Sequence, residues 1–157
     1  MSGVTAAVSG PAATGTAEPG QSYEFSPDLV ALLSPLSESA ESVRTIRTHL
    51  LTQHVHAGRR ALAVCAPALG VGSTFLAANL AVAMSQTGLQ VLLFDADLRN
   101  PSVNRFIKPS EPVEGLADCL AAPEFRPGDY IQADVLPGLS VMFAGHAALN
   151  APELLAG

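Results

Sequence analysis

The chain has few of the residues that build metal clusters, disulfide scaffolds or nucleic-acid interfaces. It contains two cysteines, no tryptophan and one lysine, Lys108, among eight basic residues. Two cysteines without a metal-ligand spacing exclude a disulfide framework and a zinc site, and we expect both thiols, Cys65 and Cys119, in the core. A net charge of −6 disfavours a polybasic surface, so we expect no nucleic-acid partner.

Long apolar runs and a secretory leader are also missing. No stretch approaches the roughly 18 consecutive apolar residues of a membrane span, and the first residues lack a basic segment followed by an apolar one. These absences predict a cytoplasmic chain without direct membrane insertion. We expect residues 1–27, which are rich in Ala, Gly, Ser, Thr and Pro, to form a disordered tail, and residues 28–157 to form one domain.

Short apolar runs alternate with helical patterns in the rest of the chain. The runs at 61–66, 90–96 and 139–144 lack polar alternation, which is typical of strands covered on both faces in a parallel sheet. Apolar spacing predicts helices over 36–56 and 73–87. The sequence therefore predicts an α/β fold, a parallel sheet flanked by helices.

A glycine-rich loop joins the first predicted strand to the second predicted helix. Gly70 and Gly72 allow the backbone to approach a phosphate, and the helix dipole favours the anion. The hydroxyl of Thr74 has the position of a Mg²⁺ ligand in such loops, whereas Ser73 replaces the lysine that would contact the β and γ phosphates. The alternative is a plain glycine-rich turn.

Two acids and a base follow the second predicted strand. Asp95, Asp97 and Arg99 lie at its carboxyl end, where α/β folds bind ligands, and two carboxylates suit a hydrated Mg²⁺. Asp95 could instead cap the following loop, and Asp97 with Arg99 could form a surface ion pair.

These motifs resemble those of the bacterial tyrosine kinases of capsule and exopolysaccharide synthesis, relatives of the MinD and ParA P-loop ATPases. The run FDADLRNPS (94–102) is similar to the family's Walker A′ motif, and Glu41, Arg44 and Arg47 match its E-x-x-R-x-x-R helix motif. Residues 115–155 are similar to the stretch that precedes Walker B. The resemblance implies a P-loop NTPase fold that is truncated here before the Walker B strand.

The resemblance also implies cofactors, partners and roles for individual residues. It implies ATP and Mg²⁺, self-association into rings through the 36–56 helix, and recruitment to the inner face of the plasma membrane by a polysaccharide co-polymerase or adaptor protein. The alternative for the helix motif is a solvent-exposed helix face with i,i+3 ion pairs and no role in assembly. The implied residues are Asp95 and Asp97 for catalysis; Gly70, Val71, Gly72, Ser73, Thr74 and Arg99 for the nucleotide; Thr74, Asp95 and Asp97 for the metal; and Glu41, Arg44 and Arg47 for oligomerisation.

The chain departs from the family pattern at the loop lysine, at the missing Walker B strand and at the missing C-terminal tyrosine cluster. Lys108, Arg99 and Arg105 are candidate replacements for the lysine, and a partner subunit is another. The H-x-H of His54 and His56 has no third metal ligand near it in sequence, so it is interpreted as a polar helix end. Capping residues near 150–153 predict a further helix start, so the chain is expected to end inside a structural unit.

Three functions remain in competition. The first is a kinase-like regulatory or assembly module, a pseudokinase, in which Ser73 impairs ATP binding and catalysis. The second is an active ATP-dependent protein tyrosine kinase. The third is a MinD- or ParA-like positioning ATPase, against which the lack of a basic surface and the presence of the helix motif argue.

Overall fold

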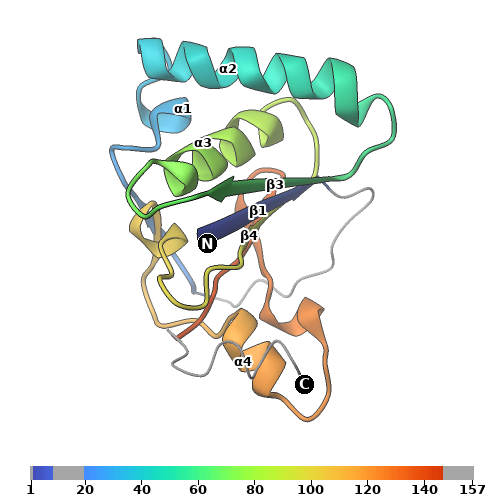
Figure 1. Ribbon diagram of the computed structural model, residues 1–157. Coiled ribbons are helices and arrows are strands. Elements are labelled where there is room, and N and C mark those ends of the chain that lie inside the picture. Colours follow the sequence, from blue (N-terminus) through green and yellow to red (C-terminus); the bar gives the residue numbers. More distant parts are fainter. Residues whose placement is uncertain (1, 9–19, 147–157) are drawn as a thin grey trace.

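The computed structural model describes residues 2–8 and 20–146, in which a mixed five-stranded sheet carries helices on both faces (Figure 1). The strand order is β3 (Ala61–Ala66), β1 (Ser2–Val8), β4 (Val91–Asp95), β7 (Leu139–Met142), β6 (Gln132–Leu136). β4 and β7 are parallel, whereas β1 is antiparallel to both of its neighbours and β6 is antiparallel to β7. The predicted α/β fold is confirmed, and the three predicted strands run in the same direction.

Three helices cover one face of the sheet. They are α1 (Val30–Leu33), α2 (Glu38–Leu50) and α3 (Ser73–Ser85), and Figure 1 shows α3 between α2 and the strands. α2 begins where the Ser37 side chain accepts a hydrogen bond from the N–H of Ala40, and it continues through a π-helical turn over Leu51–Val55. The helices predicted over 36–56 and 73–87 are therefore confirmed.

α3 is apolar nearly all round because it is packed between two layers. Its residues from Ala77 to Ser85 are buried. They form the main core together with α1, α2 and the helix-covered face of β4 and β7. The largest fully buried apolar side chains of this core include Leu29, Leu80, Val82, Leu93, Val103, Ile107, Leu139 and Val141.

A smaller core lies on the opposite face, beneath β4 and β7. It is formed around α4 (Leu116–Ala121) and includes the buried side chains of Leu98, Cys119 and Met142. Short 3₁₀ turns at Val103–Arg105 and Pro127–Tyr130 connect these elements, and β2 (Tyr23–Phe25) pairs with β5 (Ile107–Pro109) as a separate two-stranded sheet. This second layer places the segments that follow β4 and β7 beside each other.

The tail predicted over residues 1–27 needs correction at two stretches. Ser2–Val8 forms β1 between β3 and β4, and Tyr23–Phe25 forms β2. A strand inside a sheet is held by two rows of backbone hydrogen bonds, which small residues form as well as large ones, so a composition poor in large apolar residues does not exclude a strand. Residues 9–19 lie outside the described part of the chain, as does the helix start predicted near 150.

The two cysteines differ in exposure. Cys119 is buried in α4, as predicted, but Cys65 is exposed and its prediction as a core thiol is wrong. β3 is an edge strand in which Leu62 and Val64 pack toward the helices, while Cys65 belongs to the alternate, exposed set of side chains. No helix in the described residues is long and apolar enough to span a bilayer.

Candidate nucleotide site

The glycine-rich loop leaves β3 after Ala66 and ends where α3 begins at Ser73. Gly70 and Gly72 have φ angles of 77° and 90°, a left-handed conformation that favours glycine, and a Cβ at either position would meet nothing within 4 Å. The space over the loop is therefore open. The first N–H groups of α3 have no intrahelical acceptors, so they are available to an anion at this position.

The loop is bordered by apolar side chains and contains no cation. Leu69 and Val71 are 66% and 60% exposed, and Ser73 at the first position of α3 is half-buried. An anion at the loop would therefore meet backbone N–H groups, hydroxyls and the helix dipole, without a charge from the loop itself.

Asp95 ends β4 and is almost completely buried, at 1% exposure. Its Oδ1 accepts from the N–H of Asp97 at 3.1 Å, and its Oδ2 accepts from the N–H groups of Ser102 and Val103, both at 3.0 Å. Burial raises the pKa of the Asp95 carboxyl above its usual value, against the lowering effect of these three donors, with a smaller upward contribution from the charge of Asp97. The predicted alternative in which Asp95 caps the following loop is confirmed.

Asp97 organises the next turn in the same manner. Its Oδ1 accepts from the N–H of Asn100 at 2.9 Å and of Arg99 at 3.3 Å. The Arg99 side chain is exposed, and no salt bridge joins it to Asp97 in the described residues, so the alternative of a surface ion pair is not observed. The two carboxylates thus hold the backbone of the segment after β4.

A hydroxyl pair joins the acidic segment to the glycine-rich loop. Thr74 Oγ1 lies 2.7 Å from Ser102 Oγ, and Ser102 also donates its backbone N–H to Asp95. Phe75 packs edge-to-face on Phe106, with ring centroids 6.4 Å apart, and supports the same contact between α3 and the segment after β4. Ser102 therefore links Thr74 to Asp95 through one hydrogen bond to each. The sequence alone gave no reason to expect this role for Ser102.

The oxygen atoms here are of the kind that Mg²⁺ prefers. Oδ2 of Asp97 accepts no hydrogen bond from the described residues, Oδ1 of Asp95 accepts one, and Thr74 adds a hydroxyl. Mg²⁺ binds through one or two carboxylates and keeps several waters, so the chemistry of these donors suits the ion. The described residues contain no cluster of three or more His, Cys, Asp or Glu side chains that would hold a metal without such waters.

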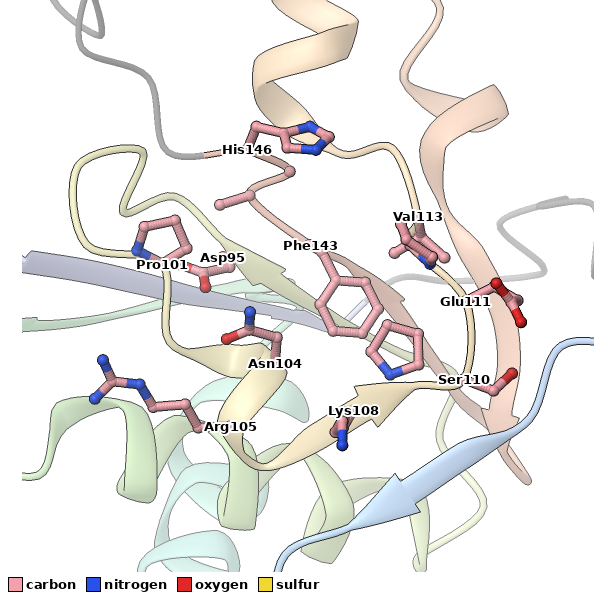
Figure 2. A pocket seen from close by; sticks show the side chains of 14 residues that line it. Asp95, Pro101, Asn104, Arg105, Lys108, Ser110, Glu111, Val113, Phe143 and His146 are labelled. Atoms are coloured by element: carbon pink, nitrogen blue, oxygen red, sulfur yellow. The ribbon is translucent and has the colours of Figure 1, made fainter.

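A cavity of about 760 Å³ opens beside Asp95, at the carboxyl ends of β4 and β7. Figure 2 shows Phe143 in its wall, with Asp95 and Asn104 on one side and Val113 on the other. The volume of the cavity lies within the range of small-molecule sites. The cavity has no signal in the sequence, because its lining comes mainly from segments 101–113 and 143–146, which only the paired strands bring together.

Comparisons with known proteins agree with this geometry. A ParA family model, described as the NUBPL iron-transfer P-loop NTPase, matches residues 58–134. The putative tyrosine-protein kinase EpsB of Ralstonia nicotianae is 34% identical over 128 residues, which are 81% of this chain and 17% of that protein. Tyrosine-protein kinase YwqD of Bacillus subtilis is 39% identical over 77 residues, 49% of this chain and 32% of that protein.

Solved structures give the same result. The BceF tyrosine kinase domain superposes with a TM-score of 0.67 at 31% identity, over 82% of this chain and 50% of that one. The chain is a homologue of the bacterial tyrosine-protein kinases. The chimerical protein CapA2B2 is also similar, with a TM-score of 0.62 at 26% identity over 85% of this chain and 58% of that one. This kinase homologue thus spans about half of the solved domains and a smaller share of the curated sequences.

In this kinase homologue the candidate replacements for the loop lysine lie elsewhere. Lys108, on β5, pairs with Glu24 on β2 at 3.4 Å, and both side chains are largely exposed. Arg105 lines the cavity beside Asp95, and Arg99 is exposed within the acidic segment after β4. None of these three side chains makes a hydrogen bond with Ser73 in the described residues.

The helix motif of the kinase homologue makes contacts within the chain. Arg44 binds Glu41 through a 2.6 Å ion pair and donates to the carbonyl of Pro35 at 2.6 Å. Arg47 lies against α3, donates to the carbonyl of Ala83 at 3.5 Å, and has a buried Nε without a hydrogen-bond partner. The predicted i,i+3 ion pair is confirmed for Glu41 and Arg44, and the role of the motif in oligomerisation stays a prediction.

The H-x-H pair shows no metal-binding arrangement in the described residues. His54 Nδ1 lies 2.8 Å from the Arg59 guanidinium, and His56 is exposed. The interpretation as a polar helix end is consistent with these contacts.

Proposed function

We propose that this chain is a tyrosine-kinase-like P-loop domain of exopolysaccharide or capsule synthesis whose ATP binding and catalysis are weak and which acts as a regulatory or assembly module. The observation that carries this proposal is Ser73, at the first position of α3 and beside two left-handed glycines. A serine hydroxyl cannot supply the charge-assisted contact that a lysine makes with phosphate oxygens. Within the loop, the phosphates would be held by N–H groups, hydroxyls and the helix dipole, without a lysine charge.

The ligands of the proposed site are ATP and Mg²⁺. The loop from Gly70 to Thr74 would bind the phosphates and Arg99 would lie beside them. Thr74, Asp95 and Asp97 would hold the ion, and one of the carboxylates would accept the proton of a tyrosine hydroxyl. Support comes from the 2.7 Å contact of Thr74 with Ser102, from the burial of Asp95, and from the oxygen atoms that remain available for a hydrated ion.

The test is a titration of a fluorescent ATP analogue with Mg²⁺ into the wild-type chain and into Ser73→Lys. A charge-assisted hydrogen bond contributes about 1.5–3 kcal/mol, so the lysine variant is expected to bind about 10- to 150-fold more tightly. Ser42→Lys is a matched control, because Ser42 is exposed on α2 and the variant adds the same charge outside the site. Tight binding of equal strength by wild type and Ser73→Lys would contradict the proposal.

An active tyrosine kinase is the first alternative, favoured by the intact D-x-D-x-R segment and its ordered carboxylates. Incubation of the wild-type chain with ATP, Mg²⁺ and a tyrosine-containing acceptor polypeptide, followed by phosphotyrosine detection, distinguishes it. The ParA family match favours a positioning ATPase as a second alternative. Hydrolysis of ATP without phosphotyrosine would support that alternative.

The partners belong to the same proposal. We expect self-association through the 36–56 helix, on which Glu41 and Arg44 remain partly exposed, and binding to a polysaccharide co-polymerase or adaptor protein in the membrane. Such a partner would recruit a cytoplasmic domain to the inner face of the plasma membrane. The names of the relatives as tyrosine-protein kinases, one of them in a cps region, support this setting.

A further inference from the structure

Ser102 stands out because it contacts both halves of the candidate site. Its Oγ lies 2.7 Å from Thr74 Oγ1, and its backbone N–H donates to Asp95 Oδ2 at 3.0 Å. In the described residues this is the one side-chain hydrogen bond that links the start of α3 to the segment after β4. Ser102 therefore connects the hydroxyl of the loop with the buried carboxylate.

The backbone of Ser102 is held independently of its hydroxyl. Asp95 binds the N–H groups of both Ser102 and Val103, and Val103 is fully buried at the start of the following 3₁₀ turn. Removal of the hydroxyl should leave these contacts in place. The Oγ of Ser102 is thus positioned by the fold, while its visible interaction is with Thr74.

The contact between Ser102 and Thr74 can set the direction in which the Thr74 hydroxyl points. A hydroxyl has one proton and two lone pairs. When Thr74 gives a lone pair to a cation, its proton must point away from the ion and toward an acceptor. Ser102 Oγ lies at the distance of a normal O–H···O hydrogen bond and can accept that proton.

We propose that Ser102 is a positioning residue that accepts the proton of Thr74 and so turns the Thr74 lone pair toward Mg²⁺. This inference rests on the proposed nucleotide site. Ser102 itself contributes through Thr74 rather than by contact with the nucleotide. Its effect should therefore appear in the dependence of nucleotide binding on Mg²⁺, and not in binding measured without the ion.

The experiment measures the affinity of the fluorescent ATP analogue with excess Mg²⁺ and with EDTA. It uses wild type and Ser73→Lys, each with and without Ser102→Ala. We expect Ser102→Ala to reduce the Mg²⁺-dependent gain in affinity by about three- to tenfold, the effect of one neutral hydrogen bond, and to leave affinity in EDTA unchanged. Ser102→Thr keeps the hydroxyl and should retain the gain, and Ser42→Ala, which removes an exposed hydroxyl on α2, should behave as its parent.

A double variant separates positioning from a structural role. In a Thr74→Ala background, Ser102→Ala should cause no further loss, because its only route to the ion has been removed. An equal loss in both backgrounds, or a full Mg²⁺ gain in Ser102→Ala, would overturn the role of Ser102 while the nucleotide site stands. If neither wild type nor Ser73→Lys binds the analogue, the proposed nucleotide site falls, and the role of Ser102 falls with it.

Discussion

The buried amide of Asn79 on α3 offers a quantitative test of how the helical layer is held together. Asn79 is 0% exposed, and its Oδ1 accepts from the N–H of Ala31 at 2.9 Å. Its Nδ2 donates to the carbonyl oxygens of Asp28 and Phe75, at 2.9 and 3.0 Å. One side chain therefore joins the start of α1 to α3.

The cost of Asn79→Ala follows from the groups left behind. The N–H of Ala31 lies in the first turn of α1, so it has no intrahelical acceptor, and it is buried. A buried donor without a partner costs about 1–3 kcal/mol. The carbonyl of Phe75 still accepts within α3 and Asp28 is exposed, so these two groups add less. With the small cavity, we expect a loss of about 2–4 kcal/mol in the free energy of unfolding.

The assay is urea denaturation followed by far-UV circular dichroism. With a slope of about 2 kcal/mol per molar urea, the midpoint of Asn79→Ala should fall by about 1–2 M. Asn100→Ala is the matched control, because Asn100 is exposed and its side chain makes no hydrogen bond in the described residues, so its midpoint should stay close to wild type. Equal midpoints for the two variants would refute the argument that Asn79 fastens α1 to α3.

Three further predictions concern pH, assembly and thiol exposure. Burial raises the pKa of Asp95, so the native state binds a proton more readily than the unfolded chain. The free energy of unfolding of wild type should therefore fall as pH rises from about 4 through the raised pKa. Denaturation at several pH values checks this slope, which should be absent from Asp95→Asn. Arg44→Ala should sediment as a smaller species than wild type if α2 mediates self-association, and a monomeric wild type would remove that role from the isolated chain. Cys65 should react with a thiol reagent in the native protein and Cys119 only after denaturation, whereas two fast-reacting thiols would contradict the packing of α4.

The sequence predicted those elements whose residues carry their own signal. Apolar runs located β3, β4 and β7, and an apolar helix after a glycine-rich loop located α3. The acids after β4 were found because they follow a buried apolar run directly, at the end where α/β folds bind ligands. Local pattern and chemistry coincide at these positions, so no tertiary information was needed.

The remaining features depend on contacts between distant segments. Ser102 meets Thr74 across 28 positions of sequence, and no spacing rule predicts that pair. The capping role of Asp95 was one of two open alternatives until its three N–H donors were visible. Cys65 looked buried because its strand is apolar throughout, but exposure on an edge strand is decided by what covers the sheet.

The position of β1 has a practical consequence for experiments on this protein. Ser2 is opposite Ala66, the residue before the glycine-rich loop, and Val4 is opposite Asp95. The amino-terminal end of β1 therefore lies at the same edge of the sheet as the candidate nucleotide site (Figure 1). An affinity tag fused there would place extra polypeptide next to the loop, so nucleotide binding should be measured after the tag has been removed.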